Sequence, residues 1–427
     1  MVSDNFKIIG DIRLPGDKSI THRVLLLSAF IKGQHTIQNF PNNEDVVATL
    51  LILNQYGLNY YLNDDNINID SRNISFKDSE IDCNDSGTTA RLMCGYLSGF
   101  NINCIIKGSE SLSKRPMSRI VNPLREFGVN IDCNDGMLPI RIKKTNKIKT
   151  HFNYRLDLPS AQIKSALIFY ALSIDAESSI EGKIKTRDHL ELLLSYLKYP
   201  IKMNDKQILI KGNHKISNNL NINLPGDISS ASFLIAAAIL LKDSNLIIRN
   251  ICVNPYRMGF IRQLIKMGAK IRLINKRQHY GELIADIKVK YSMNLAGIVV
   301  EEADVPSMID EIPIFCVVAA FSIGSTEIKG IKELKYKESD RIAAIIENFS
   351  EMGTEIKHAN NNLLINPKKK MYNTSIRSFN DHRIFMSFYI ANLVLGQFYS
   401  DELEDNCYRK SFVNFIEVMQ KVVCEKF

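Results

Sequence analysis

The feature that most constrains the fold of this chain is an internal repeat that divides it in half. The tetrapeptide LPGD at 14–17 returns at 224–227, and each copy precedes Ser or Thr, small residues and an apolar run. Regular spacing argues against coincidence, because the six helix starts follow one another at intervals of roughly 70 to 80 residues. Six related helix-containing units are therefore predicted. The four further segments with this pattern begin at Asp85, Ser160, Asp310 and Asp381.

A second recurring marker is a glycine at the end of an amphipathic segment, just before a short apolar segment typical of a strand. Glycine just past a helix end accepts the left-handed backbone conformation that closes many helices. The third unit has Tyr199 and Pro200 at this place, so we expect it to close differently. The pattern predicts an α/β protein of two domains, each built of three repeated α/β units. The glycines are Gly57, Gly128, Gly268 and Gly353.

Composition places the chain among soluble globular proteins. Of its 427 residues, 45% are hydrophobic and 23% are charged, which is ordinary for that class. The longest apolar stretches, 233–241 and 314–323, are shorter than the roughly 18 residues that a membrane-spanning helix needs. The N-terminus has neither an apolar signal core nor the character of a transit peptide, so we expect a cytoplasmic protein without a membrane partner.

Charge and motifs narrow the chemistry. The net charge of +8 suits anionic small molecules, and the short basic runs lack interleaved aromatic residues, so no nucleic-acid partner is expected. The eight cysteines form no C-x-x-C pair, which indicates reduced core cysteines. The sequence contains no G-x-G-x-x-G, Walker A, H-E-x-x-H or G-x-S-x-G motif, so nicotinamide, metal and serine-hydrolase chemistry find no support.

The polar residues that remain are cations at the helix starts and in the loops that join them. Helix N-termini present free N–H groups and a positive dipole end, and arginine adds a fork of paired donors. Each cation taken alone is most simply a solvated surface charge. These cations, however, occupy equivalent positions in the repeats. If the six helix starts converge, the cations together predict a binding site for multiply charged anions. These cations are Lys18, Arg23, Lys114, Arg115, Lys337, Arg341, Arg383, Arg409 and Lys410.

A series of motifs in fixed order makes a resemblance specific. They read LPGDKSITHR from 14, SGTTAR from 86, SLSKRPM from 111, SAQIKSAL from 160, PGDISSA from 225, IDEIP from 309, KYKESDRI from 335, DHR from 381 and RKSFVNF from 409. One of them alone, such as DHR, would indicate little. In this order and over essentially the whole chain, the sequence resembles the EPSP synthase family, the 3-phosphoshikimate 1-carboxyvinyltransferases.

The resemblance implies a fold and a reaction. The family's two domains of three α/β units would comprise 17–227 and 1–16 plus 228–427 here, with the active site in the cleft between them. The reaction transfers the enolpyruvyl group of phosphoenolpyruvate to the 5-hydroxyl of shikimate 3-phosphate by addition and elimination, and releases phosphate. It belongs to the shikimate pathway of chorismate and aromatic amino acid biosynthesis and uses neither metal nor cofactor. We expect a monomer whose partners are these two small molecules, and a target of glyphosate.

Matching the motifs residue by residue assigns the ligands that the family's site would have here. The resemblance places shikimate 3-phosphate on Lys18, Ser19, Arg23, Ser160, Ala161, Gln162, Arg187, Asp310 and Lys337. It places phosphoenolpyruvate on Lys18, Gly87, Arg115, Gln162, Arg341, Arg383 and Lys410. Asp310 matches the proton acceptor, Glu338 matches the residue assigned to proton transfer at the methylene carbon, and Lys18 shares the catalytic role. The alternative role for Asp310 is to cap the helix that follows it, and both roles can hold.

Four positions depart from the commoner family pattern. Asp85 stands where many members have Asn, and Glu333 stands where some have an Asn that contacts the ring. The segment 186–189 replaces a Ser-x-x-Tyr element, which leaves Arg187 as its phosphate ligand, and Val413 replaces a Pro. No charged catalytic position is lost. Gly87 lacks the methyl group that would obstruct glyphosate, whereas the negative charge of Asp85 opposes this inhibitor.

Two other functions compete with this one. The UDP-N-acetylglucosamine enolpyruvyl transferases have Lys-Asn in place of Lys18 and Ser19, and they use a Cys on a loop that has none here. A repeat-built anion-binding protein without activity would not need Asp310 and Glu338. Phosphate release measured with and without shikimate 3-phosphate separates the three functions.

Overall fold

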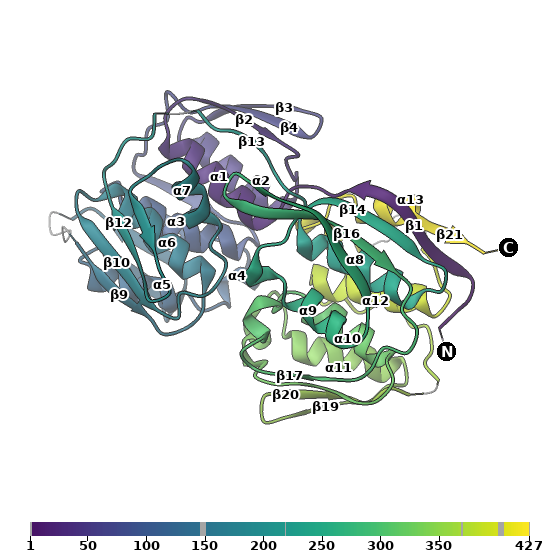
Figure 1. Cartoon of the computed structure of the whole chain (residues 1–427). Coiled ribbons are helices and arrows are strands. Elements are labelled where there is room, and N and C mark those ends of the chain that lie inside the picture. The colour runs from purple at the N-terminus through teal and green to yellow at the C-terminus, as the bar shows by residue number, and fades with distance from the viewer. Residues whose placement is uncertain (1, 146–150, 218, 369, 400–404, 427) are drawn as a thin grey trace. The chain divides into compact units, whose positions relative to one another are not determined.

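The computed structural model describes residues 2–145, 151–217, 219–368, 370–399 and 405–426. The chain folds into two compact units (Figure 1). The central unit comprises Gly16–Leu224 and His279–Glu282. The terminal unit comprises Met1–Pro15, Pro225–Gln278 and Leu283–Phe427.

Small sheets of one topology recur through both units. In each four-stranded sheet a parallel pair is joined to an antiparallel third strand, which carries an antiparallel edge strand. The repeated α/β construction predicted from the sequence is therefore confirmed. The central unit has the orders β13 (Asn221–Asn223)-β2 (Gln34–Gln38)-β4 (Asn66–Asp70)-β3 (Asn59–Asn63), β5 (Ser79–Asp82)-β6 (Cys104–Lys107)-β8 (Met137–Lys143)-β7 (Asn130–Asn134) and β9 (Asn153–Leu156)-β10 (Glu177–Gly182)-β12 (Gln207–Lys211)-β11 (Ile201–Met203).

The terminal unit has a sheet of the same kind and a larger one. The larger sheet begins with a parallel and an antiparallel pair as the others do, and β21 is added beside β1. The segment after residue 381 thus contributes the edge strand β21 to this five-stranded sheet. The two orders are β17 (Val299–Val300)-β18 (Thr326–Ile328)-β20 (Asn362–Ile365)-β19 (Ile356–Ala359) and β15 (Lys270–His279)-β16 (Glu282–Lys290)-β14 (Asn245–Cys252)-β1 (Phe6–Arg13)-β21 (Val423–Glu425).

The two copies of LPGD stand where strands are exchanged between the halves of the chain. Strand β1 precedes the first copy but pairs in parallel with β14, which follows the second copy. Strand β13 precedes the second copy but pairs in parallel with β2, which follows the first. Each repeat thus begins with a strand from the other half of the chain. The chain passes from the terminal to the central unit between Pro15 and Gly16, and it returns between Leu224 and Pro225.

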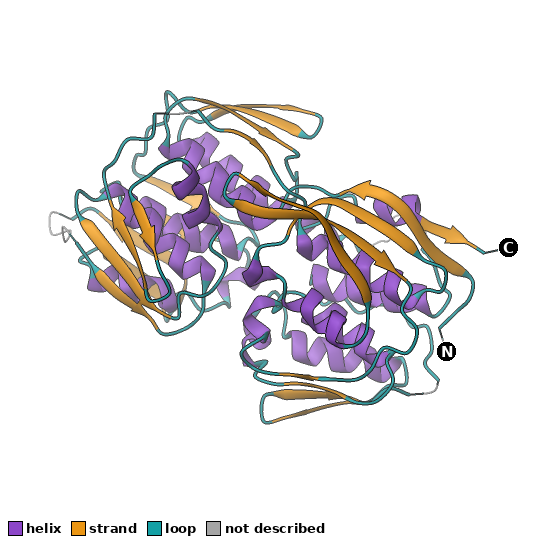
Figure 2. Ribbon diagram, viewed as in Figure 1, coloured by secondary structure: helices purple, strands orange, loops and turns teal. Residues whose placement is uncertain are grey.

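Helices fill the interior of each unit, and strands lie on the outside (Figure 2). The central unit contains α1 (Lys18–Phe30), α2 (Glu44–Gln55), α3 (Gly87–Leu97), α4 (Glu110–Ser113), α5 (Ser118–Glu126), α6 (Ala161–Ser173) and α7 (His189–Tyr196). The terminal unit contains α8 (Ile228–Leu240), α9 (Gly259–Lys266), α10 (Ile312–Ala320), α11 (Arg341–Glu351), α12 (His382–Val394) and α13 (Phe415–Val422). Short 3-10 turns are η1 (Pro255–Arg257), η2 (Val305–Ser307), η3 (Lys332–Tyr336) and η4 (Cys407–Lys410).

The six predicted helix starts are those of α1, α3, α6, α8, α10 and α12. These helices are the core of the fold: α8 and α12 are buried along their whole length, because small and apolar residues surround the axis on all sides. Five of the six begin with a side-chain cap, in which an oxygen accepts a backbone N–H of the first turn. The caps are Asp17, Ser86, Ser160, Asp227 and Asp381.

The four predicted glycines end their helices in the left-handed conformation, and the helix of the third unit ends without a glycine. The four glycines have positive φ angles between 80° and 98°. In the third unit Lys198 takes this position after α7 with φ 58°, and the N–H of Tyr199 donates to the carbonyl of Leu194. A lysine in the left-handed region is uncommon, and here the following Pro200 prevents the helix from continuing.

A short segment at the tip of the β15–β16 hairpin belongs to the central unit, which the sequence did not indicate. The Tyr280 ring meets the Tyr196 ring edge-on with centroids 5.4 Å apart. The Nδ1 atom of His189 lies 2.6 Å from Glu282 Oε1, and both side chains are buried. In the described part of the chain, no helix is both long and apolar enough to cross a membrane. The eight cysteines are free thiols.

Candidate active site

The predicted site residues fall into two sets, one in each unit. The central set is Lys18, Ser19, Arg23, Gly87, Arg115, Ser160, Ala161, Gln162 and Arg187. The terminal set is Asp310, Lys337, Glu338, Arg341, Arg383 and Lys410. We describe each set by itself and name it the central or the terminal half-site.

Arg23 joins two helix starts in the central half-site. Its side chain is 1% exposed, so the guanidinium needs partners inside the unit. It donates to Ser19 O at 2.7 Å, to Ser165 Oγ at 3.0 Å and to Ala161 O at 3.3 Å. These contacts tie the first turn of α1 to the first turn of α6, where Ser160 caps the helix.

Gly87 begins α3 and faces two arginine side chains. A Cβ atom on Gly87 would lie 3.0 Å from Arg91 Nη1 and 3.2 Å from Arg115 Nη1. Arg91 also donates to Gln162 Oε1 at 3.0 Å, and Gln162 Nε2 donates to Thr88 Oγ1 at 2.9 Å. Two guanidiniums, the backbone of a helix start and an amide side chain therefore meet here, and this group of donors suits a phosphate.

Arg91 is a site residue that the motifs did not single out. It stands in the SGTTAR motif, one helical turn after Gly87, where a side chain points back toward the first turn. That spacing was the signal that could have identified it.

Acidic side chains also lie near the starts of α2 and α3. Lys18 Nζ lies 2.6 Å from Asp45 Oδ2, and the Ser109 hydroxyl donates a short hydrogen bond to Asp85. A pocket of about 370 Å³ opens beside these groups. The negative charge of Asp85 is thus partly satisfied by a local donor. The residues lining the pocket are Glu44, Asp45, Val47, Asp82, Asn84, Asp85, Ser86 and Ser109.

Arg341 organises the terminal half-site. It is 1% exposed and lies 2.8 Å from Asp381, 2.6 Å from Glu338 and 3.7 Å from Asp310. Burial opposes its charge, but the carboxylates of Asp381 and Glu338 outweigh burial and raise the pKa of Arg341. Lys337 Nζ lies 3.2 Å from Asp310 Oδ1, so two cations share the carboxylate of Asp310.

The prediction that Asp310 caps the following helix is wrong. The cap position of α10 is Glu311, and it makes no side-chain cap hydrogen bond within the described residues. Asp310 instead lies one residue earlier, where its carboxylate faces Lys337 and Arg341. Glu311 is buried and accepts a short hydrogen bond from the Ser229 hydroxyl, which fixes the backbone beside Asp310.

The start of α12 adds the remaining cations. Asp381 caps this helix by accepting from the N–H of Arg383 at 2.9 Å, and it also accepts from Arg341. Arg383 is buried in the same turn. Lys410, in η4, donates to Asn380 Oδ1 at 2.9 Å and so lies beside the helix start. Asp381 is a positioning residue that the motif DHR contains but that the predicted site left out.

Three other positions depart from the family pattern. Arg187 is half-buried in the segment before α7. Glu333 is half-buried in η3, and Val413 is exposed after η4.

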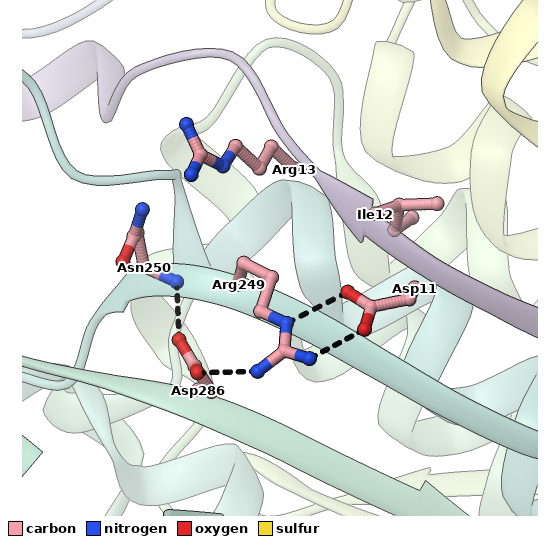
Figure 3. Close-up of a pocket in the computed structure, with 6 residues that line it drawn as sticks. All are labelled: Asp11, Ile12, Arg13, Arg249, Asn250 and Asp286. Atoms are coloured by element: carbon pink, nitrogen blue, oxygen red, sulfur yellow. Dashed lines mark hydrogen bonds and ion pairs between the residues drawn. The ribbon is translucent and has the colours of Figure 1, made fainter. Parts of the chain in front are cut away.

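A pocket of about 400 Å³ on the five-stranded sheet contains none of the predicted site residues (Figure 3). Arg249 on β14 lies 2.7 Å from Asp11 on β1 and 2.8 Å from Asp286 on β16. The carboxylate of Asp286 also accepts from the N–H of Asn250. The charges of this pocket thus hold three neighbouring strands together.

The fold is that of the enolpyruvyl transferases. The enolpyruvyl transferase NikO from Streptomyces tendae matches 100% of this chain with 98% of its own, at a TM-score of 0.73 and 13% identity. The EPSP synthase from Acinetobacter baumannii matches 100% of this chain with 99% of its own, at a TM-score of 0.84 and 31% identity.

Sequence comparison assigns the family within this class. The sequence model of EPSP synthase (3-phosphoshikimate 1-carboxyvinyltransferase) matches residues 2–419, so the chain belongs to that family. The 3-phosphoshikimate 1-carboxyvinyltransferase of Endomicrobium trichonymphae is 37% identical over 422 residues, 97% of each chain. The one of Clostridium tetani is 40% identical over 380 residues, 88% of this chain and 86% of that one. The chain is therefore a transferase of the shikimate pathway, which confirms the family and the activity expected from the motifs.

Proposed function

We propose that the two half-sites together bind phosphoenolpyruvate and shikimate 3-phosphate and transfer the enolpyruvyl group to the 5-hydroxyl. The observation that carries this proposal is the grouping of Asp310, Glu338 and Lys337 around the buried Arg341. An acid, a base and cations for anionic substrates are what this reaction requires.

The proposed ligands are those that the family resemblance assigns. Shikimate 3-phosphate binds Lys18, Ser19, Arg23, Ser160, Ala161, Gln162, Arg187, Asp310 and Lys337. Phosphoenolpyruvate binds Lys18, Gly87, Arg115, Gln162, Arg341, Arg383 and Lys410. The phosphate of phosphoenolpyruvate fits the donors around Gly87, because two guanidiniums and a helix start converge there.

Asp310 acts as the base in the addition step. The 5-hydroxyl oxygen bonds to C2 of phosphoenolpyruvate while its proton passes to Asp310, and Glu338 gives a proton to the methylene carbon. In the elimination step Glu338, deprotonated by the addition, takes a proton back from the new methyl group, the C2–C3 double bond forms again, and the C2–O bond to phosphate breaks. Asp310 gives its proton to the phosphate that leaves, so both carboxylates return to their starting state. Lys18 and Lys337 balance the negative charge that these steps move.

Arg341 links binding to the proton transfer by Glu338. Arg341 donates to Glu338 Oε2 at 2.6 Å. A substrate carboxylate on Arg341 would compete with Glu338 for the same donor. Substrate binding would therefore release Glu338 from Arg341 for the transfer of a proton.

We also propose that the domains are 17–227 and 1–16 plus 228–427, and that the protein works as a cytoplasmic monomer without metal or cofactor. Glyphosate, which carries a phosphonate and a carboxylate, would occupy the phosphoenolpyruvate ligands and inhibit in competition with that substrate.

Phosphate release measured with and without shikimate 3-phosphate tests the function. We expect release from phosphoenolpyruvate only when shikimate 3-phosphate is present, and none with UDP-N-acetylglucosamine. Lys410→Met should lose most of the activity, because its ammonium lies at the α12 start. Lys421→Met, an exposed change in the same unit, is the matched control and should retain it. Phosphate release that does not depend on shikimate 3-phosphate would contradict the proposal.

A further inference from the structure

Lys164 and Glu191 form a buried ion pair that the proposed mechanism does not use. Their side chains are 1% and 0% exposed, and Lys164 Nζ lies 2.7 Å from Glu191 Oε1. The pair joins α6 to α7 in the central unit (Figure 1). A buried ion pair is often no more stabilising than apolar residues of the same volume, so stability alone does not account for its presence.

The ammonium of Lys164 makes two further contacts, both with one loop. Nζ donates to Ile184 O at 3.0 Å and to Thr186 O at 3.0 Å. Lys164 therefore makes two hydrogen bonds to the loop and an ion pair with Glu191. The carbonyl of Ile184 also accepts from the N–H of Thr186, and Lys164 links both carbonyls to α6.

The loop held in this way leads directly to Arg187, the residue after Thr186. Lys164 stands one helical turn after the start of α6, which carries Ser160, Ala161 and Gln162. The same start is fixed to α1 by Arg23, which donates to Ala161 O and to the neighbouring Ser165 Oγ. One side chain thus links the loop that precedes Arg187 to the helix start that carries Ser160, Ala161 and Gln162.

We propose that Lys164, held in turn by Glu191, is a positioning residue that places Arg187 on the phosphate of shikimate 3-phosphate. The proposal rests on the proposed function, in which Arg187 binds that phosphate. Lys164 itself does not touch the substrate. An apolar residue of the same length would fill the space but could not hold the two carbonyls that precede Arg187.

The test measures the Kd for shikimate 3-phosphate by titration calorimetry in the full-length chain, together with the thermal unfolding midpoint. Lys164→Met should weaken binding about tenfold or more, the loss expected when a charged donor to a phosphate is displaced. It should also lower the unfolding midpoint, because Glu191 stays buried without its cation. Lys164→Met combined with Glu191→Leu removes both charges and should recover stability while binding stays weak.

A double-mutant cycle with Arg187→Gln tests whether Lys164→Met weakens substrate binding through Arg187. Arg187→Gln alone should weaken binding about tenfold or more, and adding Lys164→Met to it should weaken binding little further, since both act through one contact. Arg249→Met is the matched control: it disrupts ion pairs in the terminal unit and should lower stability without changing the Kd.

Three results would overturn the inference: an unchanged Kd in Lys164→Met, a Kd that recovers together with stability in the double variant, or effects of Lys164→Met and Arg187→Gln that simply add. Failure of the proposed function looks different, because the unaltered chain would then not bind shikimate 3-phosphate. That outcome would remove the inference as well.

Discussion

At the scale of single residues, the terminal half-site depends on Arg341 because three carboxylates face one buried guanidinium. Asp381 caps α12 and receives two donors from Arg341, so it holds the guanidinium in place. Glu338 accepts a hydrogen bond from Arg341 at 2.6 Å, and Asp310 lies 3.7 Å from Arg341 and accepts from Lys337 at 3.2 Å. Arg341 therefore brings a helix cap and the two proposed proton-transfer residues together.

Asp310→Asn should keep the fold and lose most of the turnover. Asparagine keeps the shape of the side chain but cannot accept the proton of the substrate hydroxyl. General base catalysis contributes roughly 10²- to 10⁴-fold, and we expect kcat to fall within this range. Steady-state kinetics with both substrates saturating, together with circular dichroism, measures it. A folded variant that retained more than half of its turnover would exclude Asp310 as the base.

Gly87→Ala should raise the KM for phosphoenolpyruvate and reduce inhibition by glyphosate. The added methyl group would lie 3.0 Å from Arg91 Nη1 and 3.2 Å from Arg115 Nη1, so both guanidiniums must shift by a few tenths of an ångström. These are flexible side-chain ends, and the fold should therefore tolerate the change.

Gly10→Ala is the matched control. Its methyl group would lie 3.2 Å from the side chain of Val422, a contact as close as that at Gly87, but Gly10 is not a proposed ligand. Glyphosate is titrated at fixed phosphoenolpyruvate in all three proteins. Equal sensitivity of the Gly87→Ala variant and the unaltered chain would show that Gly87 does not border the inhibitor.

At the scale of elements, the repeated Asp of LPGD has the same task in both copies. Asp17 accepts from the N–H of Ile20 and begins α1, and Asp227 accepts from the N–H of Ser229 and begins α8. Asp227 has a further partner, Arg257, at 3.2 Å, and both of these side chains are buried. The Asp of LPGD is therefore a helix cap in both copies.

The buried pair predicts a large cost for removing Asp227. Loss of a helix cap by itself usually costs about 1 kcal/mol. Asp227→Ala should lower the free energy of unfolding by about 3 kcal/mol or more, because Arg257 then loses the carboxylate that lies 3.2 Å away. Urea unfolding of the variant and the unaltered chain measures the loss. A loss of only about 1 kcal/mol would show that the Asp227–Arg257 pair does not stabilise the fold.

At the scale of the whole molecule, a buried histidine should make folding sensitive to acid. Burial, followed by the charges of Lys18 and Arg23, lowers the pKa of His22 well below 6.5. Burial also lowers the pKa of His35. In the unfolded chain both groups take up a proton near pH 6.5. As the pH falls below 6.5, the unfolded state binds more protons than the folded state, so stability decreases.

The expected loss from His22 approaches about 1.4 kcal/mol for each pH unit below 6.5. Urea unfolding at pH 7.5, 6.0 and 5.0 measures it. His22→Asn can still bond to Thr49 Oγ1, which lies 2.8 Å from the histidine Nδ1, and should show a smaller decrease. The same slope in both proteins would mean that His22 is protonated in the folded state.

The sequence by itself determined those features that depend on neighbours along the chain. Apolar periodicity with a preceding Asp or Ser located α1 and α8, and glycines at helix ends located their closures, because caps and the left-handed conformation involve only a few consecutive residues. The ordered motifs also identified the family, because they are read directly from the residues of each segment. Such local preferences can be predicted without knowledge of the fold.

Only the tertiary structure decided which distant segments meet. The pairing of β13 with β2, the hairpin tip at 279–282 and the contact of Arg91 with Gln162 join residues far apart in the sequence. The structure also excluded the alternative role of Asp310 as a helix cap, because Glu311 occupies the cap position of α10 and Asp310 contacts Lys337 and Arg341. Burial, charge pairing and hydrogen bonding depend on which groups packing brings within a few ångströms, and sequence order does not specify that.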